Sequence, residues 1–144
     1  MKVIGFSFVK LNAERSNSNL NQLNISAKMD ISSINSLKSN ISTTGEDLIG
    51  VEFTYSLQYE PDFAKIDLAG HIIFSVDSLL AKDILKEWEE KKIPEDFKIF
   101  LFNVILRKSN LKTLELEDEL GLPPHISLPS MKKGELKEKK EDNL

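Results

Sequence analysis

One stretch decides what this chain can fold into: residues 94 to 129 read PEDFKIFLFNVILRKSNLKTLELEDELGLPPHISLP. Pro94 with two carboxylates after it is typical of a helix start, because proline needs no amide partner in the first turn and acidic side chains favour the positive end of the helix dipole. Gly121 and the prolines after it end the helical pattern. The stretch therefore predicts a helix of about 27 residues, roughly 40 Å long.

The first half of this predicted helix has no polar face. A helix that is apolar on every side must be covered on every side, and one sheet covers only one of them. We therefore expect it to reach past its own subunit into an oligomer contact. Asn103 is either an amide that fixes the register of packed helices or a core Asn satisfied within the subunit. The residues expected at the contact are Phe97, Phe100, Phe102, Asn103 and Leu106.

Upstream, four segments alternate apolar and polar residues with a period of two, which is typical of antiparallel strands with one wet face. The first segment changes phase after Phe8, which predicts a bulge. Residues 12–22 and 33–47 are rich in turn-forming residues, so we expect connections there, and Glu60 to Asp62 predicts a tight turn. The strands are expected at residues 4–11, 23–31, 49–59 and 64–76.

Between the last strand and the long helix, the sequence predicts a short amphipathic helix capped by Asp77 or Ser78. The expected fold class is therefore α+β: a four-stranded antiparallel sheet followed by a short and a long helix packed on one face. Residues 1–130 are expected to form a single domain. Residues 131–144 carry five lysines and four acids, and we expect them to be a disordered charged tail.

Composition narrows the function classes. Net charge is -4, from 19 basic and 23 acidic side chains, which argues against nucleic acid as the main partner. The absence of cysteine removes disulfides and thiolate chemistry. We find no leader segment and no apolar run of membrane length, so we expect a cytoplasmic protein with no membrane insertion.

The residue pattern gives no reason to expect an enzyme. His71 and His125 are the two histidines, and neither has the spacing of a metal site; we expect His71 to be solvated on a strand and His125 to lie in a loop. The carboxylates at residues 115–119 are expected on a solvated helix face. The glycines are scattered singly, so no phosphate-binding loop is predicted. We therefore expect no catalytic residue, no cofactor and no metal.

The order of these elements resembles the protein-export chaperone SecB family. The resemblance covers Lys2 to Pro129 and is carried by the strand end GHIIFSV at residues 70–76, the short and long helices, and the exit PHISLP at residues 124–129. The chain departs from the family in a shorter proline segment, a longer and more charged short helix, and its Lys/Glu-rich tail. This last difference places in doubt any tail contact with a translocation motor.

The resemblance implies a homo-oligomer, a dimer of dimers with the helices between two sheets. It also implies an ATP-independent holdase that binds unfolded polypeptide clients in apolar grooves, for export or for an antitoxin. The client-binding residues carried over by position are Leu20, Leu23, Ile25, Ile126, Leu128 and Met131.

Three alternatives stay open at this point. Leu23 and Ile25 fit plain sheet core nearly as well as a client groove. The chain also fits a scaffold subunit whose apolar helix binds one dedicated protein partner. A small-ligand enzyme on an α+β sheet would need His71 or a carboxylate turned into a pocket.

Overall fold

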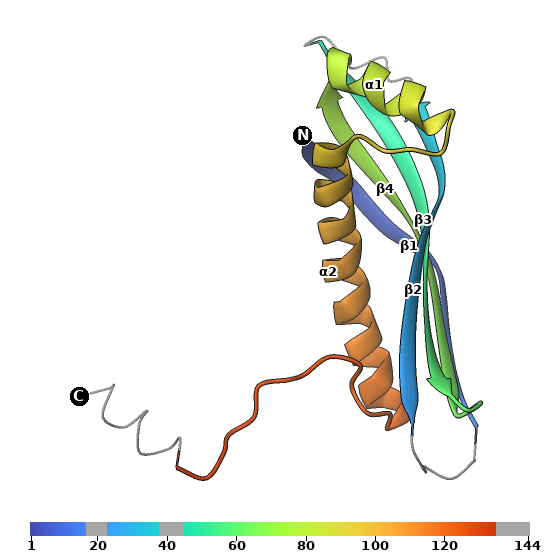
Figure 1. Ribbon diagram of the computed structural model, residues 1–144, viewed down its shortest axis with the longest axis vertical. Helices are drawn as coiled ribbons and strands as arrows, with labels where there is room; N and C mark the ends of the chain where they lie inside the picture. Colours follow the sequence, from blue (N-terminus) through green and yellow to red (C-terminus); the bar gives the residue numbers. More distant parts are fainter. Residues whose placement is uncertain (17–22, 38–44, 135–144) are drawn as a thin grey trace.

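A single antiparallel sheet with two helices on one face makes up the protein (Figure 1). The computed structural model describes residues 1–16, 23–37 and 45–134. The strands lie in the order β1-β4-β3-β2, so β1 and β2 are the edges. This confirms the α+β class and the arrangement expected from the sequence. The elements are β1 (Lys2–Arg15), β2 (Asn24–Leu37), β3 (Glu46–Glu60), β4 (Ala64–Asp77), α1 (Ser78–Trp88) and α2 (Glu95–Leu120).

The edge strand β1 is bulged twice. Its register on β4 shifts between Val3 and Gly5 and again between Phe8 and Lys10. The second shift is the bulge predicted from the phase change after Phe8, and the first was missed. At each bulge the extra residue, Ile4 or Val9, is exposed, because two residues there oppose one on the partner strand and the extra one does not continue the inward alternation.

The second strand is longer than its alternation predicts. The prediction of a connection from Ser33 was wrong, because β2 continues to Leu37. Its register on β3 shifts between Ile31 and Ser33, which changes the phase and turns Ile34 into the core. A one-residue phase change moves all later side chains to the other face, so the period-two pattern ends in the sequence although the strand does not.

Helix ends follow the sequence signals. Asp77 caps α1, its Oδ1 accepting a hydrogen bond from the Leu80 amide at 2.8 Å. At the end of α2, Gly121 adopts a left-handed conformation with φ of 65°, and the Leu122 amide donates to the Glu117 carbonyl at 2.8 Å. This turn directs the chain after α2 back across the sheet.

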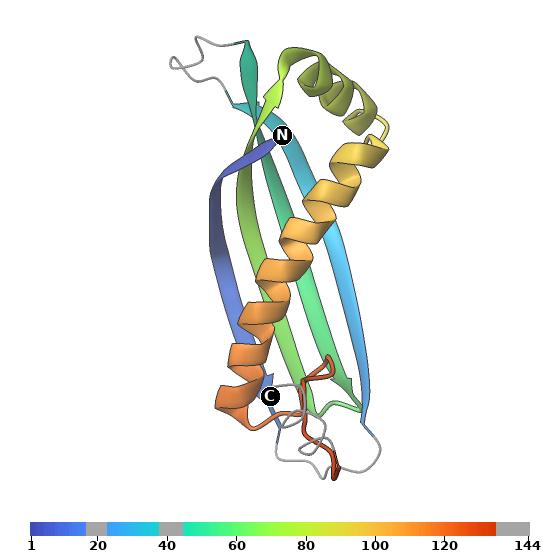
Figure 2. The ribbon, with the colours of Figure 1, turned by 90° about the vertical axis from the view of Figure 1, so that its left-hand side faces the viewer.

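The long helix crosses the sheet obliquely, from β2 at its start toward β1 at its end (Figure 2). Its buried side chains recur every four residues, so one stripe faces the sheet along the whole helix. The first three of these residues are apolar and the last three are polar. We call the two parts the upper and lower halves of α2. The buried stripe is Phe97, Leu101, Ile105, Ser109, Thr113 and Glu117.

Two hydrophobic clusters lie between the helices and the sheet. The upper cluster joins the upper half of α2 to α1 and the upper sheet, where the Phe97 and Phe74 rings meet edge to face at 5.2 Å. The lower cluster lies beneath the end of α2. Its buried members are Tyr55, Leu57, Tyr59, Phe63, Ala64, Ile66, Leu68 and Leu122.

Candidate binding groove

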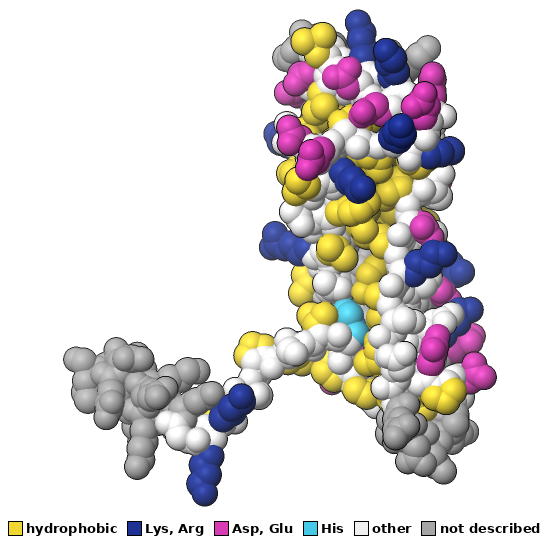
Figure 3. Space-filling view, in the orientation of Figure 1, with side chains coloured by type: hydrophobic (Ala, Val, Ile, Leu, Met, Phe, Trp, Pro, Cys, Tyr) yellow, Lys and Arg dark blue, Asp and Glu magenta, His cyan; other side chains and the backbone are white. Residues whose placement is uncertain are grey.

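An apolar groove of about 660 Å³ lies between the edge strand β2 and the upper half of α2. Figure 3 shows hydrophobic side chains gathered in a band between these two elements. The band exists because β2 has no further strand beside it, which leaves its inner residues covered on one side by α2 alone. The apolar side chains that line the groove are Met29, Ile31, Trp88, Ile93 and Phe102.

Charges of both signs surround this groove. Lys91 and Lys98 lie over aromatic rings that line it, with Nζ 4.5 Å from the Trp88 ring centroid and 5.5 Å from that of Phe102. The carboxylates of Asp30 and Glu87 also line it. Lys92 lines it as well, so three ammonium groups face two carboxylates. The groove therefore offers a ligand both apolar contact and a small excess of positive charge.

Below the groove, a buried polar network links β3, α2 and the segment after α2. Glu117 is 1% exposed, and its Oε1 lies 2.8 Å from His125 Nδ1. The other ring nitrogen, Nε2, lies 3.0 Å from Asn110 Oδ1. The Tyr55 hydroxyl donates to the same Asn110 oxygen at 3.2 Å. A buried carboxylate is tolerated here because it is hydrogen-bonded.

The second tyrosine completes the network. The Tyr59 hydroxyl contacts the Glu117 carboxylate and donates to the Pro123 carbonyl oxygen at 2.7 Å. Burial, and then the hydrogen bond to Glu117, raise the pKa of Tyr59 above its ordinary value. Burial and the Glu117 charge do the same to the pKa of Tyr55. Both phenols therefore stay protonated at neutral pH and serve as donors.

Beyond His125 the chain carries apolar side chains in the open. We call residues 126–131 the arm. Ile126, Leu128 and Met131 are 39%, 53% and 58% exposed. Apolar side chains that gather on a surface are candidates for a binding or assembly site.

The client-binding residues expected from the sequence fall into two groups. Leu23 and Ile25 are half-buried against the lower cluster, a position that suits both of the roles considered for them. Ile126, Leu128 and Met131 lie on the exposed arm. Leu20 lies outside the described residues. The upper groove was missed, although Met29 and Ile31 continue the inward alternation that begins at Leu23.

The residues expected at an oligomer contact also differ in position. Phe97 is fully buried in the subunit's own core, so it offers no surface to a second copy. Asn103 is exposed, which shows that its interpretation as a satisfied core amide was wrong. Phe100 and Phe102 are half-buried, and Leu106 is 39% exposed.

The expectation that Glu117 lies on a solvated face was wrong. His125 does lie in a loop, as expected, but its side chain and that of Glu117 are almost fully buried. The physical reason is mutual satisfaction: the imidazole and the carboxylate bind one another across the turn at Gly121. Sequence spacing gave one signal, since four-residue steps from Phe97 lead to Glu117.

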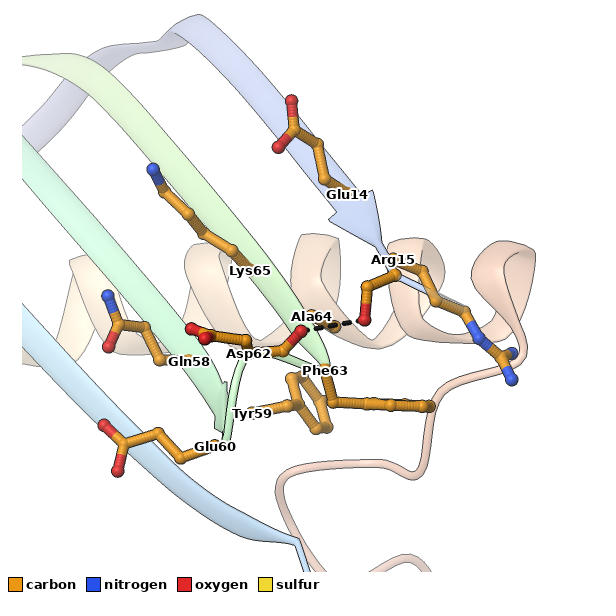
Figure 4. Close-up of a pocket in the computed structure, with 10 residues that line it drawn as sticks. Glu14, Arg15, Gln58, Tyr59, Glu60, Asp62, Phe63, Ala64 and Lys65 are labelled. Carbon is orange, nitrogen blue, oxygen red and sulfur yellow. Dashed lines mark hydrogen bonds between the residues drawn. The ribbon is translucent and has the colours of Figure 1, made fainter. Parts of the chain in front are cut away.

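A second, polar hollow of about 310 Å³ lies beside the β3–β4 turn (Figure 4). The Arg15 guanidinium points away from it and donates to the Leu120 and Gly121 carbonyls at 2.8 and 3.0 Å. Ser16 Oγ donates to the Asp62 carbonyl at 2.8 Å. These contacts tie the turn and the end of α2 to β1, which is a structural role.

Two features were sought among the described residues: a cluster of metal-binding side chains and a helix that could span a membrane. Among residues 1–16, 23–37 and 45–134, no group of three or more His, Cys, Asp or Glu side chains is placed to hold a metal ion. None of the described helices is long and apolar enough to cross a membrane. His71 lies half-buried on the outer face of β4, beside Gly50.

Similarity to solved structures supports the fold. No family model matches the chain, and no curated protein matches it in sequence. A solved structure of a SecB-like chaperone from Mycobacterium tuberculosis, in complex with a ChAD peptide from the HigA1 antitoxin, matches with a TM-score of 0.54 and 13% identity. The match covers 91% of this chain and 87% of that one. The chain therefore has a SecB-like fold, as its sequence predicted.

Proposed function

We propose that this chain is an ATP-independent chaperone, a holdase that binds unfolded or non-native polypeptides. The observation that carries the proposal is the apolar groove between β2 and α2, with the exposed arm below it, on a SecB-like fold. The similar chaperone holds an antitoxin peptide, which supports a polypeptide as the ligand. Nucleotide plays no part, because the sequence has no phosphate-binding loop.

The groove suits an extended chain. An edge strand presents unpaired backbone groups to a ligand strand, and β2 provides that edge. Apolar side chains of the ligand would lie against Met29 and Ile31 on β2. Each fully buried apolar side chain contributes about 1.5 to 3 kcal/mol, so a few of them account for micromolar binding after the cost of association. Binding of this kind accepts many sequences.

The working form in this proposal is a homo-oligomer, a dimer of dimers. Apolar side chains on the surface of α2 that faces away from the sheet support it, with Ile99 56% and Leu106 39% exposed. Phe100, Phe102 and Asn103 complete the proposed contact. Light scattering that shows a monomer at micromolar concentration would rule this part out.

The proposed setting is the cytoplasm, and the proposed clients are exported proteins before translocation or an antitoxin. A dedicated antitoxin client would make the chain a scaffold for one partner instead of a general holdase. The two roles differ in client range, which a binding assay separates directly.

The test is suppression of aggregation of several unrelated unfolded proteins, without nucleotide, followed by light scattering. We expect the chain to slow aggregation of each of them. Met29→Ser should weaken this activity, while Lys28→Ser, one residue away on the outer face of the same strand, should not. If the unaltered chain holds none of these proteins, the scaffold role replaces the holdase role.

A further inference from the structure

The segment after α2 packs against the rest of the protein as far as His125 and is exposed beyond it. Leu122 is buried in the lower cluster, and Pro123 accepts a hydrogen bond from Tyr59. The side chain of His125 is 5% exposed between Glu117 and Asn110. From Ile126 onward the described residues are exposed. The direction of the arm is therefore decided at His125.

Polar contacts secure the last held residue. We call Tyr59, Asn110, Glu117 and His125 the latch. The His125 ring bridges two positions on α2 that are two turns apart, at 2.8 Å and 3.0 Å, which leaves its plane little freedom. Loss of this ring would break both contacts, while Leu122 would keep the preceding turn in place.

The latch holds the arm outside the groove, which stays open for a ligand. Figure 1 shows the chain leaving the lower end of α2 on the side of the helix opposite the sheet. Its apolar side chains stay exposed, so they do not fill the groove in place of a ligand. A strap that competes with a ligand would instead pack on Met29 and Ile31.

We propose that Glu117 and His125 are positioning residues, which fix the arm so that its apolar side chains meet a bound polypeptide already ordered. The proposal rests on the holdase function and adds a determinant of its affinity. A segment ordered in advance loses less conformational entropy when a ligand binds to it. Releasing the latch should therefore weaken binding without altering any residue that the polypeptide touches.

The first experiment measures the arm without any ligand. The chain has no cysteine, so Ser127→Cys provides a single site for a nitroxide label on the exposed arm. We expect a restricted electron paramagnetic resonance spectrum in this background and a mobile one after His125→Ala. Thr113→Val is the matched control, since Thr113 is buried on the same face of α2 and its hydroxyl has no hydrogen-bond partner among the described residues. It should leave the spectrum restricted.

The second experiment measures affinity for a permanently unfolded probe, reduced and carboxymethylated lysozyme. We expect His125→Ala to raise Kd roughly fivefold and Thr113→Val to leave it unchanged. Glu117→Gln keeps an oxygen acceptor for His125, so its Kd should stay closer to that of the unaltered chain than the Kd of Glu117→Ala does. Circular dichroism checks the fold of each variant, and His125→Gln replaces His125→Ala if the latter loses helix.

The outcomes separate the latch from the function. A label that stays restricted after His125→Ala would overturn the latch. A mobile arm with an unchanged or lower Kd would overturn its positioning role and would indicate an arm that is idle or competes with ligand. If the unaltered chain binds no probe, the holdase proposal fails, while the resonance spectra still decide whether the latch holds the arm.

Discussion

One line of buried side chains runs along the whole of α2 and faces the sheet. These side chains are apolar in the upper half of the helix and polar in the lower half. The upper half presents Phe97, Leu101 and Ile105, all fully buried among apolar side chains. The lower half presents Ser109, Thr113 and Glu117, which are equally buried. Apolar burial is non-directional and stabilises in proportion to area, whereas a buried polar group stabilises only when its partners are in place. The upper half of α2 therefore contributes most of the stability of the packing against the sheet. The polar contacts of the lower half fix the orientation of that part of the helix.

The lower half is also imperfect. Ser109 Oγ and Thr113 Oγ1 have no hydrogen-bond partner within the described residues, while Glu117 has two side-chain partners in Tyr59 and His125. A buried hydroxyl without a partner costs free energy. The polar stripe as a whole is thus a poor source of stability, and its satisfied end serves to fix the chain after Gly121.

The largest effect that we predict is on the upper half. Phe97→Ala should remove the edge-to-face contact with Phe74 and leave a cavity, which lowers the free energy of unfolding by about 3 to 5 kcal/mol. Urea denaturation at a fixed protein concentration measures it. Ser109→Ala, three turns along the same stripe, is the matched control and should leave the free energy of unfolding nearly unchanged, because its hydroxyl has no partner among the described residues. Equal losses would contradict the division of the helix into two halves.

The second-largest change in the free energy of unfolding is expected when the buried carboxylate of Glu117 is removed. Glu117→Ala leaves His125 and Tyr59 without their shared partner, so we expect unfolding to become easier by about 3 kcal/mol. Glu117→Gln, which keeps the shape and an acceptor, should cost about 1 kcal/mol. In a double-mutant cycle with His125→Ala, the double variant should lose less stability than the sum of the losses in the two single variants. Additive losses would mean that the two side chains do not act together.

Much of the fold could be predicted because its strands alternate regularly. β3 and β4 lie inside the sheet, and each inward residue from Ile49 to Tyr59 is buried, so period two appears unbroken in the sequence. β2 was cut short because its register shift after Ile31 reverses the phase. The bulge after Phe8 in β1 could be predicted because the apolar alternation resumes in its new phase. After Ile31 the residues are mostly Ser and Asn, which fit a connection as well as a strand.

The site was harder to predict than the fold for a physical reason. Glu117 stands beside Asp118 and Glu119, and nothing local tells a buried carboxylate from its solvated neighbours. Its partner His125 becomes adjacent only after Gly121 reverses the chain. The four-residue stripe that begins at Phe97 did contain the position of Glu117, but stripes are normally followed only while they remain apolar.

The pH at which the two tyrosines ionise tests whether the polar network of the lower half of α2 is closed to water. The chain has two tyrosines, Tyr55 and Tyr59, and the pKa of each is raised by burial and by Glu117. Phenolate absorbance in the folded chain should therefore appear above the ordinary value of about 10. An unfolded chain ionises first, so the associated stability is complete below a pH of about 10 and is lost as the pH rises through the folded values. Ionisation at the ordinary value would show that the network is open to water.

The smallest effect that we predict is an increase in the free energy of unfolding. It tests most directly whether the lower half of α2 is imperfectly hydrogen-bonded. Thr113→Val replaces the buried hydroxyl, which has no partner among the described residues, with a methyl group of similar size. Threonine and valine have similar helix propensities, so the change should report the hydroxyl alone. We expect unfolding to become harder by up to about 1 kcal/mol, because the desolvation cost of an unsatisfied group disappears.

Thr54→Val is the control, since Thr54 is exposed on the outer face of β3 and its hydroxyl is satisfied by water. Urea midpoints of both variants, taken at one protein concentration, make the comparison. A loss of stability in Thr113→Val would show that its hydroxyl has a bonding role, and the lower half of α2 would then be a satisfied polar interface along its whole length.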